Sequence, residues 1–168
     1  MPDLNTALAG NRAALNDLLV TAERSATTWT TPRAPGKWSP SQLVEHVARS
    51  LEEAGNDVSG QPSKFPSVPR LMRPLLRLFL FNRVLAKNDF PKARTNRAMD
   101  PATGPASPTE ARVRSEAALA RFEQACRAQV AAGRPAQSTL FGAVSVEDYA
   151  RFQELHTRHH REQLPERG

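Results

Sequence analysis

The sequence has one cysteine and no long uninterrupted apolar run, and each shortage excludes a class of protein. Cys126 alone cannot build a disulfide framework, so a hydrophobic core must hold the fold. The most apolar stretch, Leu71 to Ala86, is interrupted by arginines and is shorter than the roughly 20 residues that span a bilayer. The first residues include Asp3 and no apolar run behind a basic cluster, which argues against a signal peptide. A cytoplasmic location is therefore expected.

Acidic residues are scarce in the middle of the chain. Between Lys64 and Arg97, nine lysines and arginines stand against the single acid Asp89, within an overall net charge of +6. This surplus raises the alternative of a nucleic-acid partner, because neutralised phosphates supply most non-specific affinity. No zinc-finger spacing, aromatic-interleaved ribbon or other nucleic-acid motif accompanies the charges. We expect a solvated basic face and no specific nucleic-acid binding.

Hydrophobic periodicity, capping residues and helix breakers divide the 168 residues into helices, and the length suits one domain over residues 1–168. The second helix has the strongest start signal, because Ser39 can cap, Pro40 suits the first position and Gln42 can complete a capping box. No sustained β alternation is present, so an all-α bundle is predicted. The expected helices are Leu4–Arg24, Pro40–Asn56, Leu71–Lys87, Thr109–Ala132 and Val146–Gln163.

The connection from Asn88 to Pro108 contains several prolines and Gly104. It is too long for a tight turn, so it predicts a crossover that allows the next helix to be a parallel neighbour.

Histidines are also few, yet three of the four fall between His156 and His160. Residues four apart on a helix lie on nearly the same side, so His156 and His160 can aim their imidazoles at one point. His46 lies in the middle of the second helix, and facing helices of a bundle commonly build metal sites from inward side chains. We therefore propose a divalent-metal site on these three histidines. A solvent-facing pair, a core His46 and His159 as a substitute ligand stay open as alternatives.

The sequence resembles the DinB/YfiT-like superfamily of metalloenzymes over nearly its whole length. The matching pieces are residues 36–46 (GKWSPSQLVEH), Phe141-Gly142, Tyr149 and residues 156–163 (HTRHHREQ). The resemblance implies a four-helix bundle with a long crossover, plus an accessory short helix or loop. It also implies a divalent metal held by His46, His156 and His160. Relatives include transferases and isomerases that use low-molecular-weight thiols, and others are described as hydrolases, so membership does not choose among these activities.

Three imidazoles leave an open coordination position, which is typical of a catalytic metal site. Zinc is the default by ligand type, with nickel, iron or manganese as alternatives. Glu53 shares a helix face with His46 and is the candidate base. Two functions stay open. One is a metal-dependent hydrolase or thiol transferase acting on a small molecule, with a thiol as one candidate substrate; the other is a non-catalytic metal-binding or regulatory helical bundle.

The helix expected over Leu71–Lys87 has an arginine stripe opposite a wide apolar arc. We expect it to bury the side that carries Leu71, Leu75, Leu78, Phe79, Leu85 and Ala86. The further large residues Leu76, Leu80 and Phe81 exceed what one core contact needs, and such patches mark interaction surfaces. This predicts a homodimer through part of the helix; the alternative is that residues 88–108 cover the patch.

Overall fold

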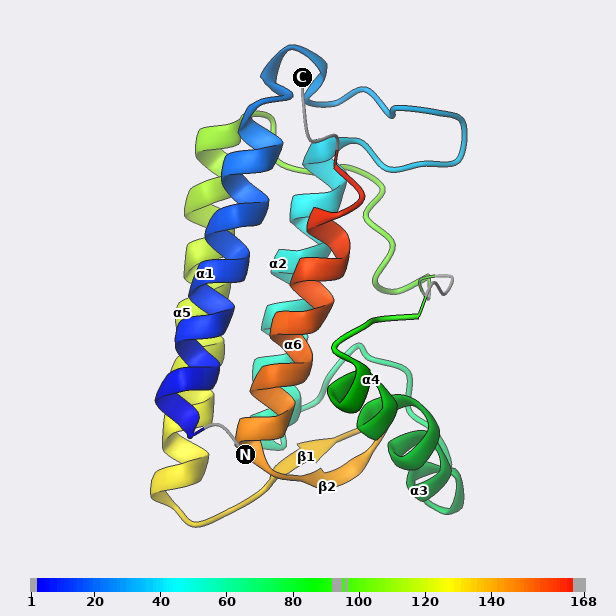
Figure 1. Cartoon of the computed structure of the whole chain (residues 1–168), viewed down its shortest axis with the longest axis vertical. Coiled ribbons are helices and arrows are strands. Elements are labelled where there is room, and N and C mark those ends of the chain that lie inside the picture. The colour runs from blue at the N-terminus through cyan, green and yellow to red at the C-terminus, as the bar shows by residue number, and fades with distance from the viewer. Residues whose placement is uncertain (1–2, 92–94, 96, 165–168) are drawn as a thin grey trace.

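The computed structural model describes residues 3–91, 95 and 97–164, and Figure 1 shows its long helices lying side by side. These are α1 (Leu4–Glu23), α2 (Pro40–Ser59), α5 (Pro108–Ala131) and α6 (Val146–Arg161). The chain is mostly helical, as predicted, and each of these helices lies within a few residues of its expected bounds. Residues 92–94 and 96 of the predicted basic stretch lie outside the described residues.

The long helices pack in two parallel pairs, α1 with α6 and α2 with α5 (Figure 1). Along the first pair, Asn11 donates to the carbonyl oxygen of Ala150 at 2.8 Å, and further on Asp17 pairs with Arg161 at 3.0 Å. Contacts between α2 and α5 also follow increasing residue number along both helices, from the pair Glu45–Arg114 to the pair Glu52–Arg121. Because α2 and α5 run in the same direction, the chain between them must return along the length of the helices.

Side-chain caps fix where these helices begin. The predicted capping box is present: the Ser39 hydroxyl accepts from the Gln42 amide at 3.2 Å, and the Gln42 side chain accepts from the Ser39 amide at 3.0 Å. Ser145 caps α6 by accepting from the Asp148 amide at 3.1 Å. Each cap satisfies amide groups that a helix start would otherwise leave without a partner.

The core lies between the long helices and contains the apolar face of each. Its largest fully buried side chains include Leu8, Leu15, Leu18, Val44, Val47, Leu51, Phe122 and Tyr149. Cys126 is fully buried in this core, and burial raises the pKa of its thiol to about 12. It is therefore a core residue and a poor nucleophile. Within the described ranges, no helix combines the length and apolar character that crossing a bilayer requires.

The helix predicted over Leu71–Lys87 exists as consecutive short segments, and most of the side expected to be buried is exposed. The segments are a 3-10 turn (Arg70–Met72), α3 (Arg73–Leu76), a π-helical turn (Arg77–Phe81) and α4 (Asn82–Lys87). Phe81 and Val84 are buried, and Phe81 stacks on Phe152 with ring centroids 5.1 Å apart. Residues expected to be buried are exposed instead: Leu71, Leu75, Leu78 and Phe79. The π turn changes the rotation per residue, which regular 3.6-residue spacing does not anticipate.

A small antiparallel hairpin precedes α6 and was not predicted. Strand β1 (Ala136–Ser138) pairs with β2 (Gly142–Val144), and three residues per strand are too few to show an alternation. The Asp57 carboxylate joins this hairpin to the end of α2, accepting from the Thr139 amide and from the Tyr149 hydroxyl, both at 3.1 Å. The hairpin therefore helps to fix the start of α6 against α2.

Candidate metal centre

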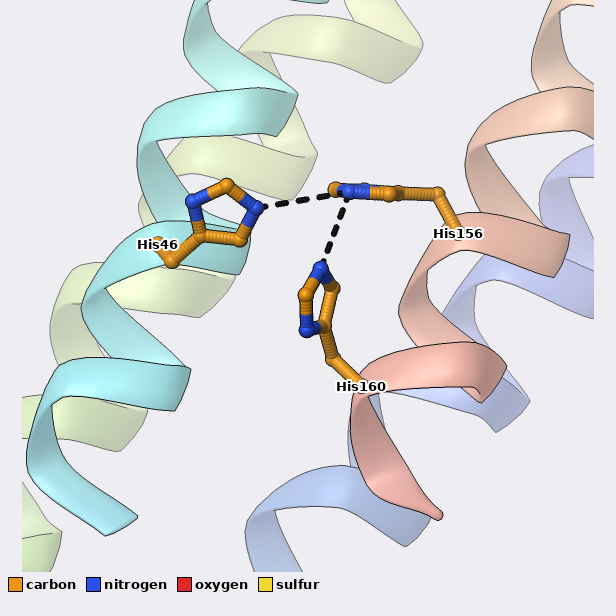
Figure 2. Close-up of side chains that lie close together, drawn as sticks. All are labelled: His46, His156 and His160. Carbon is orange, nitrogen blue, oxygen red and sulfur yellow. Dashed lines mark hydrogen bonds between the residues drawn. The ribbon is translucent and has the colours of Figure 1, made fainter. Parts of the chain in front are cut away.

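His46 lies two turns into α2, on the face directed at α6 (Figure 2). The capping box at Ser39 sets the start of the helix and so sets which residues face inward. Neighbouring positions on this face are apolar and buried, including Leu43 and Val47, and His46 itself is buried. A histidine held in the middle of a packed helix has little freedom to move its ring away from the partner helix.

Helix α6 presents His156 and His160 to α2. The two residues are one helical turn apart, so both side chains leave α6 on the same side, as Figure 2 shows. His160 is buried and His156 is partly exposed. The predicted helical spacing is therefore confirmed.

The three imidazoles converge through their Nε2 atoms. The Nε2 atom of His156 lies 3.4 Å from that of His46 and 3.1 Å from that of His160 (Figure 2). All three nitrogens lie within 4.8 Å of one another. Two nitrogen ligands of a tetrahedral zinc ion, each about 2.05 Å from the metal, are roughly 3.3 Å apart. The spacing therefore fits a set that could hold one divalent metal.

Backbone and side-chain acceptors set the tautomers of the outer two rings. His46 Nδ1 lies 2.8 Å from the carbonyl oxygen of Met99 and must be the donor, because a carbonyl only accepts. His160 Nδ1 lies 3.4 Å from the side-chain oxygen of Gln163. When these two imidazoles are neutral, the proton is on Nδ1. The Nε2 lone pair then faces the point where the three rings converge, as metal ligation requires.

Burial keeps the three rings neutral. It lowers the pKa of His156 well below the usual histidine value and lowers the pKa of His160 to about 3. The pKa of His46 is also lowered, chiefly by burial and against the opposing effect of the bond to Met99. The other imidazoles add to the effect at His156 and His160, because a second positive charge nearby disfavours protonation. Neutral imidazole is the form that binds metal.

Aromatic rings enclose the cluster on two sides. The Trp38 ring lies 4.8 Å from that of His46, centroid to centroid, and its indole nitrogen donates to Asp100 at 3.0 Å. Phe90 covers the other side, 5.2 Å from the His156 ring. These rings limit access of water to the histidines and hold them in place.

A pocket of about 770 Å³ opens onto the three imidazoles. Most of its wall is apolar or aromatic, including Trp38, Phe65, Leu80, Phe90, Phe141 and Phe152. Lys37 and Arg33 add positive charge, and Glu162 is the one carboxylate among the described residues that line it. The volume suits a small organic molecule.

A family model described as the DinB superfamily matches residues 7–164. The chain belongs to the DinB superfamily. This match spans all four long helices and all three clustered histidines, and it confirms the resemblance inferred from the sequence. No match was found among the curated proteins or among the solved structures.

Two further candidates from the sequence lie apart from the convergence point of this DinB-superfamily chain. The His159 Nε2 atom lies 3.1 Å from the Gln163 side-chain nitrogen, and the ligand group found among the described residues does not contain it. Glu53, the expected base, is buried but is not among the described residues that line the pocket. Its carboxylate accepts from the Lys64 amide at 2.7 Å. The structure thus gives Glu53 a role in holding the chain that follows α2.

Sequence reasoning missed the groups that orient the cluster. Met99 contributes through a backbone carbonyl, which leaves no signal in a sequence. Asp100 and Trp38 form a hydrogen bond across 62 positions of the chain. Trp38 stands in the segment 36–46 that carries the DinB resemblance, and its place next to a capped helix was the one signal that pointed to it.

Proposed function

We propose that this chain is a metal-dependent enzyme that holds one divalent transition metal on His46, His156 and His160. The observation that carries the proposal is the convergence of three Nε2 atoms, within 4.8 Å of one another, beside a pocket of about 770 Å³. Three imidazoles leave the fourth position of a tetrahedral ion for water or substrate, as in catalytic sites. A non-catalytic metal-binding or regulatory bundle would not need a pocket at that position, so the enzyme is the better proposal.

Zinc is the metal that we propose first, because three neutral imidazoles suit it and two of their Nε2–Nε2 separations, 3.4 and 3.1 Å, are near the tetrahedral value; nickel, iron and manganese are the alternatives. Such an ion would supply Lewis acidity, which lowers the pKa of a bound water or thiol. The residues of the chain do the rest. The bond from His46 to Met99 fixes the ring orientation, and Trp38 and Phe90 limit the access of water from their sides.

Among the activities of such an enzyme, we propose transfer of a low-molecular-weight thiol ahead of hydrolysis. Hydrolysis benefits from a general base near the metal, typically about 100-fold or more in rate. The described residues lining the pocket offer one carboxylate, Glu162, and it is exposed. A thiol has a pKa near 8.5 and loses its proton far more readily than water, so it needs less help from a base.

The proposal also covers the arrangement of the helices and of the connections between them. We propose that the long helices form a DinB-type four-helix bundle and that the connection from Asn88 to Pro108 is its long crossover, with the short helices α3 and α4 as the accessory element. Residues 1–168 would then make one domain. A homodimer stays a prediction, and the mass in solution tests it.

Metal analysis of protein purified without a histidine tag tests the site. After reconstitution with zinc and removal of excess ion, we expect about one equivalent per chain. A variant with all three histidines changed to alanine should retain almost none. Less than about a tenth of an equivalent in the unmodified protein would refute the metal site and the enzyme together.

Cobalt substitution tests the thiol step separately. Cobalt occupies zinc sites with the same ligands and reports their identity in its absorption spectrum. Adding a small thiol such as cysteine to the cobalt protein should produce a thiolate-to-metal absorption band, and the triple alanine variant serves as the blank. A loaded protein whose spectrum does not respond to thiols would leave the metal site standing and refute thiol transfer.

A further inference from the structure

Large apolar side chains are exposed mainly in one short segment of the chain, residues 70–79. Eight large hydrophobic residues are exposed among those described, and five of them lie here: Leu71, Met72, Leu75, Leu78 and Phe79. Leu71 is 90% exposed and Phe79 68%. The other three are isolated valines on α1 and α5. Scattered valines need no explanation, whereas a contiguous apolar face marks an interaction surface.

The same segment carries cations that no acid neutralises. Residues 58–88 contain no aspartate or glutamate, and residues 70–87 contain Arg70, Arg73, Arg77, Arg83 and Lys87. Arg73 and Arg77 donate to the carbonyl oxygens of Val68 and Ala143, which leaves their charges uncompensated. Within the described part of the chain, no ion pair involves residues 70–87.

In the long helices, by contrast, arginines are neutralised by acids. Bundle arginines pair with carboxylates between helices and along them, as in Arg12–Glu123, Arg112–Glu23, Arg114–Glu52 and Arg158–Glu154. The excess positive charge is therefore concentrated where the apolar face is exposed. Figure 1 shows α4 beside the lower part of α6, with α3 further out at the side of the molecule.

We propose that residues 70–87 dock this chain onto the surface of an anionic lipid bilayer. A basic segment with an exposed apolar face is the combination that lies in the interface of such a bilayer. The segment is about as thick as an α-helix, roughly 10–12 Å, so all five cations lie within about one Debye length of a bilayer that touches the apolar face. A second copy of the chain would instead bring two sets of uncompensated cations together. Charge complementarity thus selects the lipid surface.

The buried side of residues 70–87 fixes this segment to the rest of the protein. Phe81 packs among Phe141 and Phe152, with centroid distances of 5.0 and 5.1 Å. Val84 is fully buried beside them in the core. The exposed side chains therefore project from a segment that is held to the protein, and lipid contact needs no refolding.

Vesicle co-sedimentation of the full chain tests this proposal. Phosphatidylcholine vesicles containing about one third phosphatidylserine should bind the protein, phosphatidylcholine alone should not, and added salt should weaken binding. Phe79→Glu should lower the partition coefficient by about tenfold or more, because it puts a charge at the apolar contact. The matched control is Val113→Glu, an equally exposed apolar residue on α5 that should bind as the wild type does. Phe81 and Leu80 are unsuitable, since one is in the core and the other lines the pocket.

A variant with two arginines removed tests the electrostatic contribution to lipid binding. Arg70→Gln with Arg83→Gln should weaken binding by roughly twentyfold, since each cation near an anionic surface contributes about fivefold. Arg24→Gln with Arg134→Gln changes the net charge equally at exposed positions elsewhere and should bind nearly as the wild type does. Absent binding, or equal binding to both vesicle types, would overturn the proposal. So would a mass of about twice 18.5 kDa without lipid that Phe79→Glu reduces, because that outcome assigns the face to a second copy.

Discussion

His46 donates from Nδ1 to the carbonyl oxygen of Met99, 53 residues further along the chain, at 2.8 Å. This bond makes the crossover segment between α4 and α5 part of the candidate metal site. Met99 is 3% exposed, so no solvent competes for the carbonyl. The orientation of the His46 ring therefore depends on how closely the crossover packs on α2.

Several neighbouring bonds hold the crossover in that position. The Gln42 side chain donates to the carbonyl oxygen of Pro101 at 3.0 Å. The Pro105 carbonyl oxygen accepts from the Ser41 hydroxyl at 2.7 Å and from the Trp29 indole at 2.8 Å. The first turns of α2 and the chain before them are thus attached to residues 99–105 by side-chain donors and backbone acceptors.

Gly104 is the position at which this packing can be tested. A Cβ atom there would lie 2.3 Å from the Ser41 carbonyl oxygen, which cannot move without moving α2. Gly104→Ala should lower the free energy of unfolding by about 1–3 kcal/mol. It should also weaken zinc binding by roughly 10- to 100-fold, because the Met99 carbonyl shifts. Gly55→Ala is the control, since its Cβ would meet nothing closer than 3.5 Å. Lower stability with unchanged zinc affinity would show that the crossover does not orient His46.

Single alanine variants of the histidines separate ligands from neighbours. His46→Ala, His156→Ala and His160→Ala should each lower zinc affinity by about 100-fold or more, because each removes one of three donors. His159→Ala should change affinity by less than about tenfold, since its Nε2 atom lies 3.1 Å from the Gln163 side-chain nitrogen and the ligand group found among the described residues does not include it. Competition against a chelator measures all four. Equal losses in the four variants would contradict the ligand assignment.

Local signals in the sequence were enough to place the long helices and to bring the three candidate histidines together. Ser39, Pro40 and Gln42 formed the predicted capping box, and Ser145 capped α6. The spacing of His156 and His160 predicted a shared side because helical geometry depends on few neighbours. Each of these inferences used residues within about one helical turn of one another.

Inferences that needed contacts across the chain were less successful. The face buried by residues 71–87 was predicted wrongly because the π turn and the stacking of Phe81 on Phe152 are decided by distant residues. Every residue has a backbone carbonyl, so the sequence cannot indicate that the carbonyl of Met99 is the acceptor. Glu53 was chosen for sharing a helix face with His46, and such a face extends well beyond one pocket.

Glu53→Gln distinguishes the structural role of this carboxylate from the predicted role as a base. The Glu53 oxygen accepts from the Lys64 amide at 2.7 Å and from the Asn56 side chain at 3.3 Å. Weakening these charge-assisted bonds should lower the free energy of unfolding by about 1–2 kcal/mol. Zinc affinity and any measured turnover should stay within about threefold of wild type, a change worth under 1 kcal/mol. A large loss of turnover at unchanged stability would instead support the base.

Proton competition for the metal should begin below the pH that ordinary histidines suggest. An unperturbed imidazole would lose metal as pH falls through about 6.5. Burial lowers the pKa of His46, His156 and His160, with His160 at about 3, so protons compete only at lower pH. Zinc occupancy should therefore remain near its neutral value at pH 6 and fall at more acidic pH, while circular dichroism confirms that the chain is folded. Loss of half the zinc by pH 6.5 would contradict this.

Asp57→Asn should gain stability relative to wild type as pH rises. Burial raises the pKa of Asp57 above its usual 3.8, and its Oδ1 atom is buried without a hydrogen-bond partner among the described residues. Between 3.8 and the raised pKa, the folded state binds a proton that the unfolded state has released, so the free energy of unfolding falls as pH rises through this window. Asparagine does not titrate, yet its oxygen can still accept from Tyr149 and Thr139. Urea unfolding of both proteins at about pH 3.5, 5 and 7 gives the difference directly. Because both chains share every other carboxylate, the difference isolates Asp57, and a difference that stays constant with pH would show that the carboxylate is ionised in the fold at no cost.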